Sequence, residues 1–107
     1  MCMAGSTNIT ITGGTIVANQ GVGIYTIGPL TLGVKADGTV SNTEPSITAK
    51  TYGVKCTNTF NFYDGIIRGG NAAINGTISD CETGYQKVDG TEDIGGTTYN
   101  TAYLDEI

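Results

Sequence analysis

The chain has 107 residues, of which 14% are charged and 17 are glycine; it has no histidine or tryptophan, and its formal net charge is −5. This length corresponds to a single domain. The acidic balance excludes nucleic acid and anionic membrane surfaces as expected partners, and no segment is apolar enough for membrane insertion. Abundant glycine and threonine disfavour helices and favour short strands joined by tight turns.

Residues 1–7 are interpreted as an N-terminal tail. The stretch from Met1 to Ser6 lacks the charged and apolar regions of a signal peptide. The Thr/Gly/Asn-rich composition is nevertheless typical of exported repeat proteins. We therefore expect this chain to be a piece of a longer secreted precursor, located outside the cell or at the cell surface; the alternative is a protein that stays inside the cell.

From residue 8 onward, one pattern occurs three times. Two large apolar residues enclose a small polar residue, a glycine turn follows, and an apolar residue then resumes the strand. The three copies begin with Ile9-Thr10-Ile11, Leu30-Thr31-Leu32 and Phe60-Asn61-Phe62. Because alternate residues of a strand face opposite sides, the apolar pairs are expected to point inward and to stack in register. The residues expected to form the matching outer row are Thr10, Thr31 and Asn61.

Each copy also predicts a corner and a further strand. The residues expected at the corners are Gly14, Gly38 and Gly65, and those expected to supply the further strand are Ile24, Val54 and Ile74. Glycine suits a corner because the lack of a Cβ removes a steric penalty. The middle copy contains an insertion near 36–45, where Asp37-Gly38 is a strong turn signal, so a hairpin or long loop is expected there. The coils are thus assigned to residues 8–81.

The last segment, 82–107, departs from the repeat and is interpreted as a cap. Thr83–Val88 reads as a strand, and Glu92–Tyr99 reads as a hairpin that turns on Gly95-Gly96. The residues expected to cover the open end of the stack are Tyr99, Tyr103 and Leu104. No comparable polar cap precedes Ile9, so this edge is expected to pair with another copy and to produce a homo-oligomer or filament.

Together these patterns predict an all-β fold: a short right-handed parallel β-solenoid of about three coils with a C-terminal β-hairpin cap. The alternative is a β-sandwich, which also uses short strands and tight turns.

The third copy resembles a repeat of bacterial cell-surface proteins. The resemblance rests on Thr59–Ile67, preceded by Thr51–Val54 and followed by Ala73–Gly76, and it covers residues 8–104. Modules of this kind are similar to right-handed parallel β-helices, sit in long adhesin-like chains and mostly lack assigned activity. The resemblance implies a non-catalytic structural or adhesive module that acts as a stiff scaffold or a self-assembling fibre subunit.

A binding face is predicted from the outward residues. Tyr63 follows the inward pair Phe60 and Phe62, and Tyr25 is next to inward Ile24, so both rings are expected to be exposed. Exposed aromatic rings on one face can stack on sugars. The candidate binding residues are Tyr25, Tyr63, Thr10, Thr31 and Asn61, with a surface glycan as the possible ligand.

A carbohydrate-active enzyme is the alternative from a different class. Glycoside hydrolysis needs two carboxylates at one sugar bond, and the candidates are Asp64, Asp80 and Glu82 beside Tyr63. Asp64 however precedes a turn glycine, and the other two carboxylates are expected to be solvated. Arg68 is the only arginine and histidine is absent, which leaves little for lyase chemistry. We therefore expect no enzymatic activity.

The sequence also contains candidate residues for a metal site and for a disulfide. Asp89, Glu92 and Asp93 supply the hard oxygen ligands that calcium prefers, but a charged surface loop is the favoured interpretation, and no metal or cofactor is expected. The absence of histidine and of Cys-x-x-Cys spacing argues against zinc. Cys56 and Cys81 lie about one coil apart, which allows a disulfide across the stack. Two small apolar residues at turns are the favoured interpretation.

Overall fold

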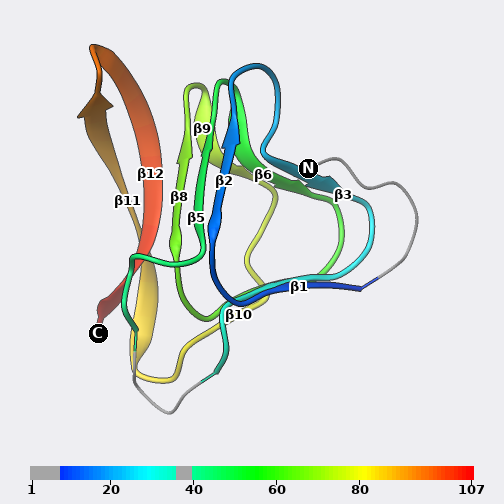
Figure 1. Ribbon diagram of the computed structural model, residues 1–107. Helices are drawn as coiled ribbons and strands as arrows, with labels where there is room; N and C mark the ends of the chain where they lie inside the picture. Colours follow the sequence, from blue (N-terminus) through cyan, green and yellow to red (C-terminus); the bar gives the residue numbers. More distant parts are fainter. Residues whose placement is uncertain (1–7, 36–39) are drawn as a thin grey trace.

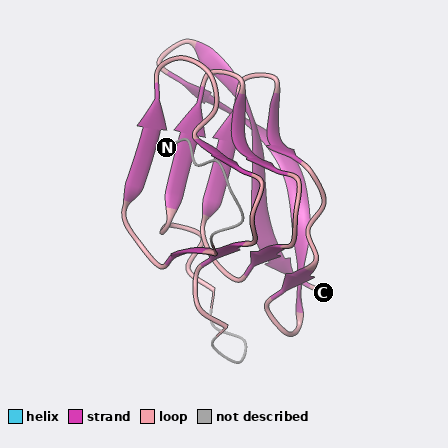
Figure 2. Ribbon diagram, turned by 90° about the vertical axis from the view of Figure 1, so that its right-hand side faces the viewer, coloured by secondary structure: helices cyan, strands magenta, loops and turns pink. Residues whose placement is uncertain are grey.

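The computed structural model describes residues 8–35 and 40–107, which form a parallel β-solenoid of three stacked coils and a C-terminal hairpin (Figure 1). Each coil contributes one strand to each of three sheets, so strands recur in each sheet at every third element. The solenoid predicted from the repeat is therefore confirmed, and the β-sandwich alternative is wrong. The strands of each sheet lie side by side along the stack (Figure 2).

The three sheets are named in the order in which the first coil enters them. The first sheet consists of β1 (Ile9–Ile11), β4 (Leu30–Leu32), β7 (Phe60–Phe62) and β10 (Asp80–Cys81). The second contains β2 (Thr15–Ala18), β5 (Ser46–Ala49) and β8 (Ile66–Gly69), extended by β12 (Thr97–Glu106) and β11 (Tyr85–Ile94). The third consists of β3 (Ile24–Thr26), β6 (Tyr52–Cys56) and β9 (Ala72–Asn75).

The apolar pairs of the repeat stack in register, as predicted. Ile9 aligns with Leu30 and Phe60, and the second member of each pair aligns in the same way. Both pairs in the second and third coils are fully buried, with 0% exposure. Burial of one such side chain contributes about 1.5–3 kcal/mol, so these columns form the main stabilising core. The first-coil pair is only half-buried, because no described strand stacks on its outer side.

The further strand of each coil is also confirmed, since Ile24, Val54 and Ile74 align in the third sheet. The corners differ from the prediction in one coil. Gly14 and Gly65 turn with positive φ angles of 88° and 115°, which favour glycine. Gly38 lies outside the described residues, and the corresponding corner of the second coil is formed by Pro45, whose carbonyl accepts a hydrogen bond from the Ile66 N–H at 3.0 Å.

The insertion in the second coil is a loop over its described part, residues 40–45, with no strand. Asn42 anchors this loop to the hairpin: its Nδ2 donates to the Leu104 carbonyl at 2.7 Å, and the Leu104 N–H donates to its Oδ1 at 3.1 Å. The Asn42 amide thus pairs with the β12 backbone as a neighbouring strand would. The loop is tied to the C-terminal end of the chain.

The C-terminal hairpin turns at Gly95-Gly96 as predicted, and its two strands pair along their whole length. It covers the stack by adding β12 antiparallel to β8, where Ala102 aligns with Ile67. Of the three residues expected to cover the open end, only Leu104 is fully buried, whereas Tyr99 and Tyr103 are half-buried. Ala102, which was not expected there, is also fully buried. The hairpin therefore works through edge pairing and aliphatic packing.

Cys56 and Cys81 do not face each other along one column. Cys56 is buried at the end of β6 in the third sheet, whereas Cys81 is half-buried in β10 of the first sheet, and both are free thiols. The disulfide hypothesis assumed that a separation of one coil places two residues in the same sheet, and that assumption is wrong here. No helix within residues 8–35 and 40–107 has the length and apolarity needed to cross a membrane.

Candidate functional site

The predicted outer row exists on the first sheet. Thr10, Thr31 and Asn61 align across β1, β4 and β7, and Asp80 of β10 aligns next to Asn61. Thr10 and Asp80 are exposed, and the two residues between them are half-exposed. We call these four residues the polar row. Alternation in the strands explains it, because the neighbouring apolar residues occupy the inner face.

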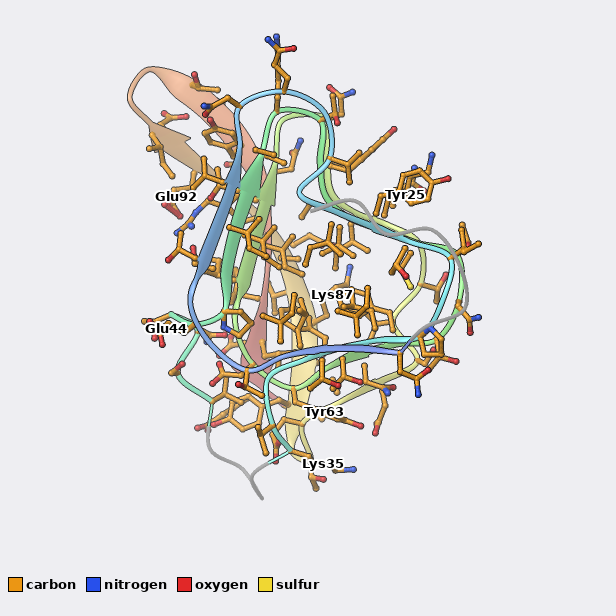
Figure 3. The ribbon with its side chains drawn as sticks, turned by 45° about the vertical axis from the view of Figure 1, so that its right-hand side comes forward. Tyr25, Lys35, Glu44, Tyr63, Lys87 and Glu92 are labelled. Carbon is orange, nitrogen blue, oxygen red and sulfur yellow. The ribbon has the colours of Figure 1, made fainter. Side chains whose placement is uncertain are left out.

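Tyr63 lies directly after β7 and contacts the end of the polar row (Figure 3). Its hydroxyl donates to Asp80 Oδ2 at 2.9 Å, and Lys35 Nζ lies 3.5 Å from the same oxygen. The Lys35 ammonium also lies 5.7 Å from the centre of the Tyr63 ring, within cation–π range. We call these three residues the Tyr63 cluster. Lys35 was missed from the sequence, because it belongs to a loop far from Asp80 along the chain and matches no motif.

Tyr25, the remaining candidate, lies on a different sheet. It aligns with Lys55 and Asn75 on the outer side of the third sheet, and the Lys55 ammonium lies 4.9 Å from its ring centre. Figure 3 shows Tyr25 and Tyr63 on different sides of the stack. The structure therefore brings four of the five predicted binding residues together and leaves Tyr25 outside the group.

The contacts in the Tyr63 cluster shift the pKa values of Asp80 and Tyr63. The hydrogen bond from Tyr63 lowers the pKa of Asp80 below its ordinary value, and Lys35 acts in the same direction. Desolvation and the Asp80 carboxylate raise the pKa of Tyr63. At neutral pH the cluster therefore presents an ionised Asp80 carboxylate and a neutral Tyr63 phenol. These groups accept and donate hydrogen bonds, but an ionised carboxylate is a poor general acid.

Removal of the phenol tests this arrangement. In a Tyr63→Phe variant we expect the pKa of Asp80 to rise toward the ordinary aspartate value, because the hydrogen bond that favours its charged form is lost. The side-chain carboxyl shift of Asp80, followed by NMR through a pH titration, measures this change. The matched variant Tyr25→Phe should leave the titration as in the wild type; an equal change in both variants would contradict the assignment.

Of the other two candidate catalytic carboxylates, Asp64 has a structural role. Asp64 accepts hydrogen bonds from the Ser41, Asn42 and Gly65 N–H groups at 3.0, 2.9 and 2.7 Å, and one from the Ser41 hydroxyl at 3.0 Å. Its oxygens are therefore engaged in holding the insertion loop against the corner at Gly65. This is the role of a turn residue, as the Asp-Gly pattern indicated.

Glu82 is only 1% exposed, so the expectation that it is solvated is wrong. The chain turns into β11 at this point, where the Tyr85 N–H donates to the Glu82 carbonyl at 3.0 Å. Every buried side-chain nitrogen and oxygen of the described residues has a hydrogen-bond partner, as burial of a polar group requires. Of the three carboxylates, Asp80 alone is both exposed and part of the polar row.

The three acidic residues that are candidate calcium ligands each have a different partner. Asp89 pairs with Lys87 at 2.8 Å, Glu92 pairs with Arg68 at 3.2 Å, and Asp93 accepts from the Thr98 hydroxyl at 2.6 Å. Within the described part of the chain, no three His, Cys, Asp or Glu side chains are grouped so as to hold a metal ion.

The first sheet thus offers a row of hydroxyl, amide and carboxylate groups with one aromatic ring beside its end. Such a surface can bind polyhydroxylated or peptide ligands through hydrogen bonds and ring contact. No protein-family model matches this chain, and no curated protein or solved structure is found to be similar to it.

Proposed function

We propose that this chain is a non-catalytic structural or adhesive module of an exported, adhesin-like bacterial surface protein. The observation that supports the proposal most is the continuous register of all three sheets across the three coils. Each coil is buried only by its neighbours, so the stack behaves as one stiff unit. Such a unit works by geometry, holding the polar row at a fixed spacing and orientation for a partner.

The same proposal includes self-association through the first coil. β1, β2 and β3 are edge strands of the described sheets on this side, and Val17 of β2 is 63% exposed. At the opposite end, β10 and β12 continue the first two sheets, and β9 is the edge strand of the third among the described strands. Two copies that pair through their first coils present the hairpins outward, which gives a closed two-fold dimer rather than an open fibre.

Association is tested by sedimentation velocity over a wide range of protein concentrations. We expect a concentration-dependent dimer, and we expect Val17→Lys to shift the protein to monomer because a charge on an edge strand opposes pairing. Thr48→Lys is the matched control: Thr48 aligns with Val17 in the same outer row, but lies on the inner strand β5. A wild type that stays monomeric at every concentration would contradict self-association and favour a self-contained display module.

A second candidate is glycan binding at the polar row, favoured by the Tyr63 cluster at its end. The test is a glycan array with hydrolysis controls, followed by NMR titration of any ligand found. Tyr63→Ala and Asn61→Ala should abolish binding, whereas Tyr25→Ala, on another sheet, should not. Turnover of a bound glycan would contradict the non-catalytic proposal, and loss of binding in Tyr25→Ala alone would move the site to the third sheet.

A further inference from the structure

A cleft of about 520 Å³ lies beside β9, at the end of the third sheet opposite to the first coil. Its floor and walls are of different character. The floor is mostly apolar and comes from β9 and the residues on either side of it; the wall is polar and comes from β11 and β12. The lining residues that matter here are Ala73, Ile74, Thr77, Ile78, Lys87 and Asp89.

The cleft lies where a further strand of the third sheet would lie. Beyond the third coil, the first sheet continues with β10 and the second sheet continues with β12. Among the described strands, none pairs with β9 on the side away from β6. Residues of both hairpin strands, β11 and β12, line the cleft, so the hairpin limits it on the side away from β9. In Figure 3, Lys87 projects within the outline of the coils.

The columns of the third sheet define the chemistry of an added strand. The inner column consists of Ile24, Val54 and Ile74; the first two are fully buried at 0% exposure, but Ile74 is only half-buried. A further strand would therefore stack an apolar residue on Ile74. The outer column is polar from Lys55 to Asn75, so the neighbouring residue of the added strand would be polar.

The charges on the cleft wall further restrict which kind of segment can bind there. Lys87 and Asp89 form an ion pair at 2.8 Å and present both signs together. Such a wall favours a segment without strong net charge. A sheet edge binds polypeptide through main-chain hydrogen bonds, a contact that sugars and small molecules do not reproduce. β9 has 4 residues, which corresponds to a contact about 13 Å long.

We propose that this cleft binds an extended polypeptide segment from a partner protein, which adds to β9 as the next strand of the third sheet. The segment alternates apolar and polar residues and has little net charge. This site lies apart from the polar row and does not depend on the proposed scaffold function. A peptide that binds here would attach the module to its partner through the backbone.

The probe is a synthetic peptide with the sequence of residues 51–57, with serine in place of Cys56, because β6 already packs in register with β9. Isothermal titration should give saturable binding, and NMR shift changes should map to β9 and β11. A scrambled peptide should not bind. Thr77→Trp, which fills the cleft, should weaken binding about tenfold or more, whereas Thr12→Trp at the opposite end of the stack should not.

Thermal unfolding by circular dichroism verifies that both tryptophan variants fold. Binding that Thr77→Trp leaves unchanged would overturn the proposal, as would shift changes at β3, the other edge of the third sheet. Absence of binding by this peptide and by a set of alternating uncharged peptides would also overturn it. Self-association that Thr77→Trp abolishes without any peptide would assign the cleft to a second copy of this chain, against the proposal.

Discussion

Phe60→Ala should lower the free energy of unfolding by about 3–5 kcal/mol, the cost of replacing a fully buried phenylalanine by alanine. Phe60 is 0% exposed, and its ring packs against that of Phe62 with the ring centres 5.9 Å apart. It also stacks in register on Leu30. Because domains of this size are stable by about 5–15 kcal/mol, the loss takes a large part of the total. Urea denaturation followed by circular dichroism measures it.

The matched control is Val34→Ala, which removes an apolar side chain that is 60% exposed in the loop after β4. Its effect should stay within about 0.5 kcal/mol, as for most surface substitutions. If Phe60→Ala were as mild as Val34→Ala, the inward stacking of the repeat would be wrong. A changed slope of the denaturation curve in Phe60→Ala would instead indicate altered compactness of one of the two states.

Asp64→Ala should destabilise the protein by about 3 kcal/mol, because several donors lose a charged acceptor at once. The carboxylate accepts two hydrogen bonds from Ser41 and one each from the Asn42 and Gly65 N–H groups. Without it the insertion loop is no longer held at the corner, and the Asn42 contact with Leu104 loosens as well. Chemical denaturation measures the stability, and faster hydrogen exchange of the Leu104 amide reports the loosened contact.

Two variants separate the loop anchor from a general charge effect. Asp64→Asn keeps one acceptor oxygen and should cost less than Asp64→Ala. Asp105→Ala removes an exposed carboxylate near the end of β12 and should have little effect. A normal stability of Asp64→Ala combined with loss of a glycan-cleaving activity would contradict the structural role and support a carbohydrate-active enzyme.

The columns of the core could be predicted from the sequence because they depend on local alternation. A strand that reads apolar–polar–apolar has one inner face, so the copies that begin at Ile9, Leu30 and Phe60 define both the columns and the number of coils. The hairpin could be predicted for the same reason, because its turn is marked locally in the sequence by Gly95-Gly96. Pro45 as a corner was not predictable, because the insertion shifts the turn away from the Asp-Gly signal.

The candidate site was predictable only in part. Register alone places Thr10, Thr31 and Asn61 in one row, and that row is confirmed. Asp80 joins the row through the short strand β10, and Lys35 reaches its end from a loop; no periodic pattern predicted either position. Alternation also tells which residues point outward, but it does not tell which sheet they join, and for this reason Tyr25 was grouped with residues on another face. The burial of Glu82 was likewise not predictable, because no periodic pattern covers the segment that contains it.

The reversed direction of β12 against β8 limits how this molecule can be lengthened. All strand pairs between successive coils are parallel, and the chain reverses direction only at the hairpin. A coil appended after β12 would meet a strand of the opposite direction and lose its register. A duplicated coil inserted between the second and third coils would meet parallel neighbours on both sides and leave both ends unchanged. Variation in length, in nature or by engineering, is therefore expected from internal duplication of coils.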